Sequence, residues 1–358
     1  MKKFLALLLA LTMALALVAC GGGNDSSDTA TSGGDSESGF EPMTWKFACS
    51  ATETSPWVDG AKEFARIVGE KTGGAITVQY YPADQLTAGS QTDGIQALMD
   101  GTTELSMHSN LIWSSFDQRF NVVSLPFLFD SVEEADAALD GAGGEALGEI
   151  LENEYNVHLL GIAENGFRHI TNSKRPIQSL ADMNGLKIRV AGSQVLNRAY
   201  QLWGADYTNA NWSEVFTALQ TGTYDGQENP LPTADAASIQ EVQNYLTYWT
   251  GAYDCLFFCM NAELYNSLSP ELQAIVDEAG QAACEYEREL NRSQDQEIMD
   301  KWAEAGVEIT ELTPEAAAEF AEASAPVYDE FADELTPELI EAFTSVTQAD
   351  AGTTEPAA

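Results

Sequence analysis

The chain has 358 residues, of which 16 are Lys or Arg and 56 are Asp or Glu, giving a formal net charge of −40. This length exceeds the usual size of one domain, so we expect two compact lobes. So negative a surface repels nucleic acid and anionic lipid headgroups and excludes both as binding partners.

Residues 1–19 are typical of a signal peptide. Two lysines precede an apolar run over residues 4–18, which is too short to span a bilayer as a helix. The residues LVAC at 17–20 resemble a bacterial lipobox, in which Cys20 is lipidated and begins the mature chain; cleavage by an ordinary signal peptidase is the alternative. Loss of the two leader lysines changes the net charge from −40 to −42. We therefore expect an extracytoplasmic protein with a lipid anchor on the outer face of the membrane, in a periplasm or at a cell surface.

Residues 20–43 are rich in Gly, Ser, Thr and Asp and cannot bury enough apolar surface to fold, so they form a flexible linker. Strands and helices then alternate, which predicts an α/β lobe with mostly parallel pairing. Ser55-Pro56 is a good helix start and Gly73 a good helix end. The expected strands are 44–49, 76–81, 105–109 and 157–163, and the expected helices are 56–73, 92–100, 133–139 and 145–154.

A second lobe is predicted to begin near Gly166, with strands at 168–171 and 186–190 and helices at 194–203 and 212–221. Residues 245–261 are long enough for a strand that returns to the first lobe. The run 270–301 has no internal proline and suits one helix of about 45 Å. We assign 44–165 plus 255–294 to lobe I and 166–254 plus 295–345 to lobe II. Acidic helices are expected within 314–343, and a disordered tail at 346–358.

Four cysteines remain besides Cys20. Cys255 and Cys259 lie about 13 Å apart along a strand and cannot bridge each other. A disulfide from Cys49 to either of them, or buried free thiols including Cys284, both fit an exported protein.

No metal, cofactor or catalytic motif is present. The histidines His108, His158 and His169 are far apart in sequence, without the spacing of a metal site. Neither a nucleophile motif nor a nucleotide-binding glycine loop occurs. The sequence therefore predicts a protein without a cofactor that is not an enzyme.

Arg189 follows an apolar strand, at the sheet edge where ligands of open α/β sheets collect. Its planar guanidinium can bind a carboxylate with two hydrogen bonds. The alternative is a structural ion pair with one of the 56 acids. Arg168 begins the preceding strand and could converge with Arg189, or lie at the surface.

Trp212 and Asn229 are the other candidates. Trp212 stands at a helix start, where an indole can stack on a ligand or simply fill the core. Asn229 precedes a proline, which restricts where its amide points; simple turn formation is the alternative.

These motifs, in this order and spacing, resemble the DctP-type solute-binding proteins of tripartite ATP-independent periplasmic (TRAP) transporters. The resemblance covers about residues 45–330 and rests on GAITVQYYPADQL, QALMDGTTELSM, VVSLPFLF, LADMNGLKIRV, SEVFTALQTGTYDGQENPL and EVQNYLT. It implies a two-lobed periplasmic-binding-protein-like fold that closes on its ligand, with a long helix bracing both lobes. It also implies a monomeric receptor that delivers a small organic acid to TRAP membrane subunits.

The resemblance carries over four binding residues. Arg189 in KIRV corresponds to the arginine that clamps the substrate carboxylate, and Arg168 in NGFRH to a second family arginine. Asn229 in QENP and Trp212 before SEV correspond to a family asparagine and aromatic. Further candidate contacts are Ser50, Ser109, Asn110 and Asp254.

The chain departs from the family pattern in three places. Ala191 replaces a proline after KIRV, the QLTAGSQTDG loop is longer than usual, and Ser109-Asn110 stand where some members place another polar contact. The last two lie in lobe I, so the ligand's second end stays open between a dicarboxylate, a uronate or other sugar acid, and an amino-acid-like osmolyte.

Three rival functions remain. An ATP-driven importer's receptor would have an ATPase encoded beside it. A carbohydrate-active lipoprotein enzyme would use paired carboxylates such as Asp225 and Glu228. An adhesin or scaffold would bind no small acid.

Overall fold

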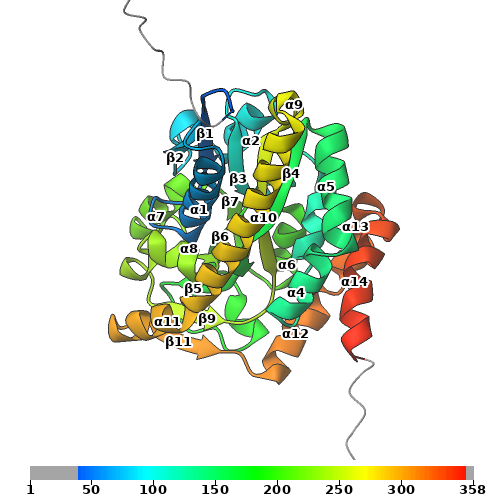
Figure 1. The fold of residues 1–358 in the computed structure, drawn as a ribbon. Helices are drawn as coiled ribbons and strands as arrows, with labels where there is room; N and C mark the ends of the chain where they lie inside the picture. Colours follow the sequence, from blue (N-terminus) through cyan, green and yellow to red (C-terminus); the bar gives the residue numbers. More distant parts are fainter. Residues whose placement is uncertain (1–38, 352–358) are drawn as a thin grey trace, which may run out of the picture. The chain divides into compact units, whose positions relative to one another are not determined.

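The computed structural model describes residues 39–351. The predicted signal peptide, Cys20 and most of the predicted linker lie outside the described residues, as do residues 352–358. The described chain forms two mixed sheets surrounded by helices, which confirms the predicted α/β fold (Figure 1). No helix in this part of the chain is long and apolar enough to cross a bilayer.

The first sheet has the strand order β2-β1-β3-β10-β4. Its strands are β1 (Met43–Cys49), β2 (Ile76–Tyr81), β3 (Leu105–Ser109), β4 (Val157–Phe167) and β10 (Tyr253–Asn261). β1 is parallel to β2 and β3, whereas β10 is antiparallel to β3 and β4. Because β1 and β3 are parallel, Ser50 after β1 and Ser109 at the end of β3 reach the same edge of the sheet.

The second sheet has the strand order β11-β9-β5-β8-β6-β7. Its strands are β5 (His169–Asn172), β6 (Lys187–Val190), β7 (Asp206–Asn209), β8 (Gly226–Asn229), β9 (Tyr245–Tyr248) and β11 (Glu308–Glu311). β6 is parallel to β7 and β8, and β5 is antiparallel to β8 and β9. Each sheet is thus mainly parallel with one strand reversed, β10 in the first and β5 in the second.

The chain crosses between the sheets at two adjacent places. β4 passes into β5 through Arg168, and β9 passes into β10 through residues 249–252. The Arg168 N–H donates to Ala252 O (2.9 Å) and Trp249 Nε1 donates to Arg168 O (2.9 Å), which ties the crossovers together. The predicted strand region 245–261 is therefore divided: β9 pairs with β5 and β11, and only β10 returns to the first sheet.

Helices occupy the connections and the C-terminal part of the chain. They are α1 (Pro56–Lys71), α2 (Gln91–Met99), α3 (Asn110–Trp113), α4 (Val132–Leu139), α5 (Ala142–Glu154), α6 (Gln194–Leu202), α7 (Trp212–Gln220), α8 (Leu231–Ala236), α9 (Ala262–Ser267), α10 (Pro270–Ser293), α11 (Asp295–Glu304), α12 (Pro314–Ser324), α13 (Pro326–Leu335) and α14 (Pro337–Ala351). The 3-10 helices are η1 (Gln85–Thr87), η2 (Gln118–Ser124), η3 (Leu180–Met183) and η4 (Ile239–Glu241). The predicted helices between residues 56 and 221 are confirmed, whereas short helices such as α3 and α8 show no periodicity from which to predict them.

The long brace is formed by α10 and α11 together. α10 packs against β4 and α1 and leads to α11, which contacts α8 and β11 of the second half (Figure 1). Gly60 of α1 permits this packing, because a Cβ there would lie 2.9 Å from the Glu287 Cβ. The predicted single helix 270–301 is interrupted at Gln294, whose N–H bonds to Asn291 O in a tightened turn before α11 begins.

The C-terminal helices α12 to α14 confirm the acidic helices expected within 314–343. α14 continues to Ala351, so the prediction of a disordered tail is wrong for residues 346–351, where no Gly or Pro interrupts the helix; the rest of that predicted tail lies outside the described residues. α14 packs against α4 and α5, and α13 packs against η2 and α6. The residue boundaries assigned to the two lobes stay a prediction.

The cysteines of the described chain are buried free thiols, which decides between the two alternatives left by the sequence. Cys49, Cys255, Cys259 and Cys284 are each at most 4% exposed. Burial raises the pKa of all four thiols above its ordinary value.

Candidate functional site

A small cavity of ≈ 30 Å³ lies where residues of both sheets meet. Seven of the eight predicted contacts line it: Ser50, Ser109, Arg168, Arg189, Trp212, Asn229 and Asp254. These residues come from strand ends and helix starts that are far apart in the sequence. The structure therefore brings them to one place.

Arg189, on β6, is a buried cation without an anionic partner. Its Nε and Nη2 donate to the Ala210 carbonyl oxygen at 3.0 and 2.7 Å, and its guanidinium carbon lies 5.6 Å from the centre of the Trp212 ring. Within residues 39–351 no carboxylate forms an ion pair with it, and its Nη1 has no hydrogen-bond partner. The sequence left a structural ion pair with one of the 56 acids as an alternative role for Arg189, and the described residues do not form such a pair.

The charge on Arg189 survives its burial. Burial, with Arg168 nearby, lowers the pKa of Arg189 to about 10, and the carboxylate of Glu228 opposes part of that effect. The side chain is therefore still protonated at neutral pH. A cation that is desolvated but unpaired is costly, so a ligand carboxylate would be bound strongly here.

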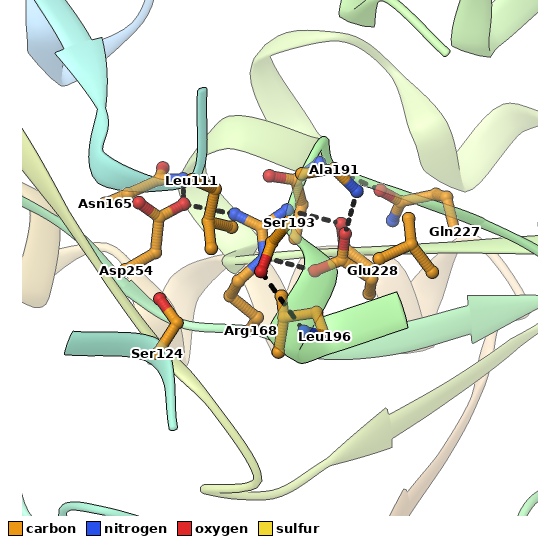
Figure 2. Close-up of polar contacts among 12 residues, drawn as sticks. Leu111, Ser124, Asn165, Arg168, Ala191, Ser193, Leu196, Gln227, Glu228 and Asp254 are labelled. Carbon is orange, nitrogen blue, oxygen red and sulfur yellow. Dashed lines mark hydrogen bonds and ion pairs between the residues drawn. The ribbon is translucent and has the colours of Figure 1, made fainter. Parts of the chain in front are cut away.

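Arg168, in contrast, is satisfied within the protein. Its Nε pairs with Glu228 Oε2, its Nη1 with Asp254 Oδ2, and its Nη2 donates to the Glu228 carbonyl oxygen at 2.8 Å. Figure 2 shows the guanidinium between these two acids. Burial alone would lower the pKa of Arg168, but Glu228 and Asp254 raise it overall. Ligand contact by Arg168 stays a prediction, and its main contacts are structural.

The two acids beside Arg168 also accept hydrogen bonds from other groups of the protein. Glu228 Oε1 accepts the Ala191 N–H at 2.8 Å. Asp254 Oδ1 accepts from Ser109 Oγ (2.7 Å). Asp254 Oδ2 accepts from Asn165 Nδ2 (2.7 Å) and from Arg168 (Figure 2). Burial raises the pKa of Asp254 above its ordinary value despite the nearby arginine.

Asn229 and Asn110 have different positions. Asn229 lines the cavity, and its Nδ2 donates to Gln227 Oε1 at 3.0 Å. Asn110 does not line it: its Nδ2 donates to Phe120 O and Ser124 Oγ, and its Oδ1 accepts the Cys255 N–H. The Asn110 side chain, at the first position of α3, thus points into the core, and its amide forms hydrogen bonds there instead of lining the cavity.

Four polar or aromatic lining residues are absent from the sequence prediction. They are Trp57, Gln91, Asn165 and Thr233. Trp57 stands in the first turn of α1, the helix that follows β1. Ligands of α/β sheets collect at this edge, and that position is the sequence signal that could have identified Trp57. Trp57 Nε1 and Ser50 Oγ are buried without any hydrogen-bond partner in the described chain.

Hydrogen bonds join the two sides of the cavity. Trp212 N donates to Gln91 Oε1 (3.2 Å), and Ser213 Oγ donates to Gly89 O (3.1 Å). Gly89 has φ +88°, and a Cβ there would lie 2.6 Å from Ser213 Oγ, so the close approach needs glycine. The long loop noted in the sequence thus reaches the start of α7.

The other polar groups of residues 39–351 are dispersed or paired with one another. Among residues 39–351 no three His, Cys, Asp or Glu side chains are grouped so that they could hold a metal ion. Asp225 pairs with Lys174 (3.2 Å) whereas Glu228 pairs with Arg168, so the two acids proposed for a carbohydrate enzyme serve different ion pairs. Burial lowers the pKa of His169 to about 3, which leaves it neutral.

Comparisons with known proteins indicate the family of this chain. The family model described as "Bacterial extracellular solute-binding protein, family 7" (DctP) matches residues 47–335. The 2,3-diketo-L-gulonate-binding periplasmic protein YiaO of Escherichia coli K12 is 32% identical over 274 residues, which is 76% of this chain and 83% of that protein.

Two solved structures are similar over most of the chain. The sugar acid binding protein DctPAm from Advenella mimigardefordensis, in complex with galactonate, has a TM-score of 0.82 and 29% identity, and covers 86% of this chain and 99% of its own. A TRAP periplasmic solute binding protein from Sulfurospirillum deleyianum with bound succinate has a TM-score of 0.79 and 30% identity, and covers 86% of this chain and 100% of its own.

Proposed function

Because the chain belongs to family 7 of the bacterial extracellular solute-binding proteins, we propose that it is a TRAP-transporter receptor that binds a small organic acid through Arg189. The ligand binds between the two sheets at the cavity of ≈ 30 Å³, which has to widen to admit it, and is handed to the membrane subunits. The protein binds and releases this ligand without transforming it.

The observation that carries the proposal is the state of Arg189. Its guanidinium is buried and its Nη1 is free. Although the chain has a net charge of −40, the described residues provide no anion that pairs with this group. A ligand carboxylate would complete its hydrogen bonds, and Trp212 beside it would cover the ligand's apolar surface. Long-range repulsion by the acidic surface is screened beyond about 8 Å at physiological salt, so it does not oppose contact binding.

The ligands of the similar proteins support this chemistry. The two solved structures contain galactonate and succinate, and the Escherichia coli relative is named for 2,3-diketo-L-gulonate; each of these molecules carries a carboxylate. The feature common to them matches the one free cation lining the described cavity.

We place the receptor outside the cytoplasm, held to the membrane by lipid on Cys20. The leader and the LVAC sequence at 17–20 support this location. Mass spectrometry of the protein purified from membranes should find a diacylglyceryl group on Cys20, and Cys20→Ala should prevent it. We propose that the mature receptor is a monomer.

Calorimetry on the protein beginning after Cys20 tests the binding site. We expect Arg189→Ala to weaken the binding of an organic acid by about 1.5–3 kcal/mol, the value of a hydrogen bond to a charged group. The control is Arg198→Ala, because Arg198 is a half-exposed arginine paired with Glu330. Equal affinity of wild type and Arg189→Ala for every acid that binds would refute the assignment.

A further inference from the structure

Two buried donors line the cavity without partners. Ser50 and Trp57 are each 4% exposed, and neither Ser50 Oγ nor Trp57 Nε1 has a hydrogen-bond partner within residues 39–351. Both lie beyond the end of β1 in the first sheet, whereas Arg189 and Trp212 come from the second. A ligand bound to Arg189 on the side of the second sheet would therefore contact Ser50 and Trp57 on the side of the first.

The chemistry of these groups restricts what they can bind. An indole N–H only donates a hydrogen bond, and a serine hydroxyl can donate or accept. Leaving such groups unpaired in a buried site costs free energy, which a ligand oxygen would recover. Both are uncharged, so they suit a hydroxyl or carbonyl oxygen and cannot neutralise a second charge.

The remaining charges of the cavity are already paired. Arg168 is bonded to Glu228 and Asp254, so it has no full charge to offer a second carboxylate. Asp254 shares Arg168 with Glu228 and also accepts hydrogen bonds from Ser109 and Asn165, so no cation on this side of the described cavity is left for a second carboxylate. Arg189 is the only lining residue of the described cavity whose charge is unpaired.

On the basis of the function proposed above, we propose that Ser50 and Trp57 form a neutral anchor that selects singly charged hydroxy or oxo acids. Arg189 binds the carboxylate, and the anchor binds hydroxyl or carbonyl oxygens at the other end. Dicarboxylates are disfavoured, because their second carboxylate would be buried without a counter-ion.

Matched ligands test this selection by calorimetry at pH 7.5. Erythronate and meso-tartrate differ only at one end, where the first has a CH2OH group and the second a carboxylate. Galactonate and galactarate differ in the same way. We expect each monoacid to bind at least about 10-fold more tightly than its doubly charged counterpart, which corresponds to about 1.4 kcal/mol or more. Equal or tighter binding of the counterparts would overturn the neutral anchor and leave the receptor function standing. Absence of binding by all of these acids would overturn the receptor function itself.

Conservative variants test the anchor residues. Trp57→Phe keeps the ring and removes the N–H, and Ser50→Ala removes the hydroxyl; each should weaken the preferred monoacid about 3- to 10-fold, the value of a neutral hydrogen bond. Trp45→Phe is the control, because the Trp45 Nε1 is equally buried and unpartnered but does not line this cavity. An unchanged affinity in both anchor variants, or an equal loss in Trp45→Phe, would refute the assignment.

Discussion

Replacement of Arg168 by methionine separates a structural role from a ligand-binding role for this arginine. Methionine retains an unbranched apolar stem but has no donor. The change removes the ion pairs with Glu228 and Asp254 and the 2.8 Å bond from Nη2 to the Glu228 carbonyl oxygen. It also leaves two carboxyl groups, with side chains 1% and 0% exposed, without a cation.

The size of the effect follows from this burial. Removing one partner of a buried ion pair costs about 3–5 kcal/mol, because the other charge stays desolvated. Asp254 already has a raised pKa, so it can take up a proton and relieve part of the cost. We therefore expect a loss of about 3 kcal/mol in the free energy of unfolding.

Urea unfolding of the ligand-free protein at pH 7.5, followed by circular dichroism, measures this loss. Arg198→Met is the control, since its ion pair with Glu330 is exposed to solvent and should contribute little to the free energy of unfolding. Adding Glu228→Gln and Asp254→Asn to Arg168→Met should recover part of the stability. A loss below about 1 kcal/mol, together with loss of ligand binding, would show that the reasoning is wrong and that Arg168 is chiefly a ligand contact.

Two further predictions concern closure and pH. Ser213→Ala removes the bond to Gly89 O across the cavity, so it should weaken ligand binding about 2- to 10-fold by calorimetry; an unchanged affinity would contradict a role in closure. Burial, with Glu164 nearby, raises the pKa of Asp295 to about 6, so its contribution to stability is complete below about pH 3.9 and is lost as the pH rises to 6. Asp295→Asn should therefore raise the free energy of unfolding by roughly 2 kcal/mol at pH 7.5 and by about half of that at pH 5, and a gain independent of pH in urea unfolding would contradict this.

Local signals in the sequence predicted most of the first sheet and its helices. Ser55-Pro56 begins α1 as expected, because the Ser55 side chain accepts the Trp57 N–H and proline fits the first turn. Strands such as 76–81 and 105–109 have the predicted bounds, because each follows closely on glycine at the end of a helix. Arg189 could be placed at a strand end from KIRV alone.

Long-range partners could not be predicted in the same way. The role of Arg168 depends on acids 60 and 86 residues away, and no local pattern indicates that they meet. Nothing in the local sequence shows whether Trp57, near a helix start, packs in the core or lines a ligand cavity. At Gln294 the helix is interrupted by a turn in which the Gln294 N–H bonds to Asn291 O. The run 270–301 has no internal proline from which this break could be predicted.

The burial of the cysteines makes it practical to label this protein with fluorophores and measure its conformational changes. Thiol reagents attack the thiolate, and burial keeps Cys49, Cys255, Cys259 and Cys284 protonated and covered. A protein that begins after Cys20 should therefore accept two introduced surface cysteines, one beside each sheet, with the native four left in place. Fluorophores on such a pair would follow the distance between the sheets in single molecules, and would count how often the receptor closes spontaneously and how long each closure lasts.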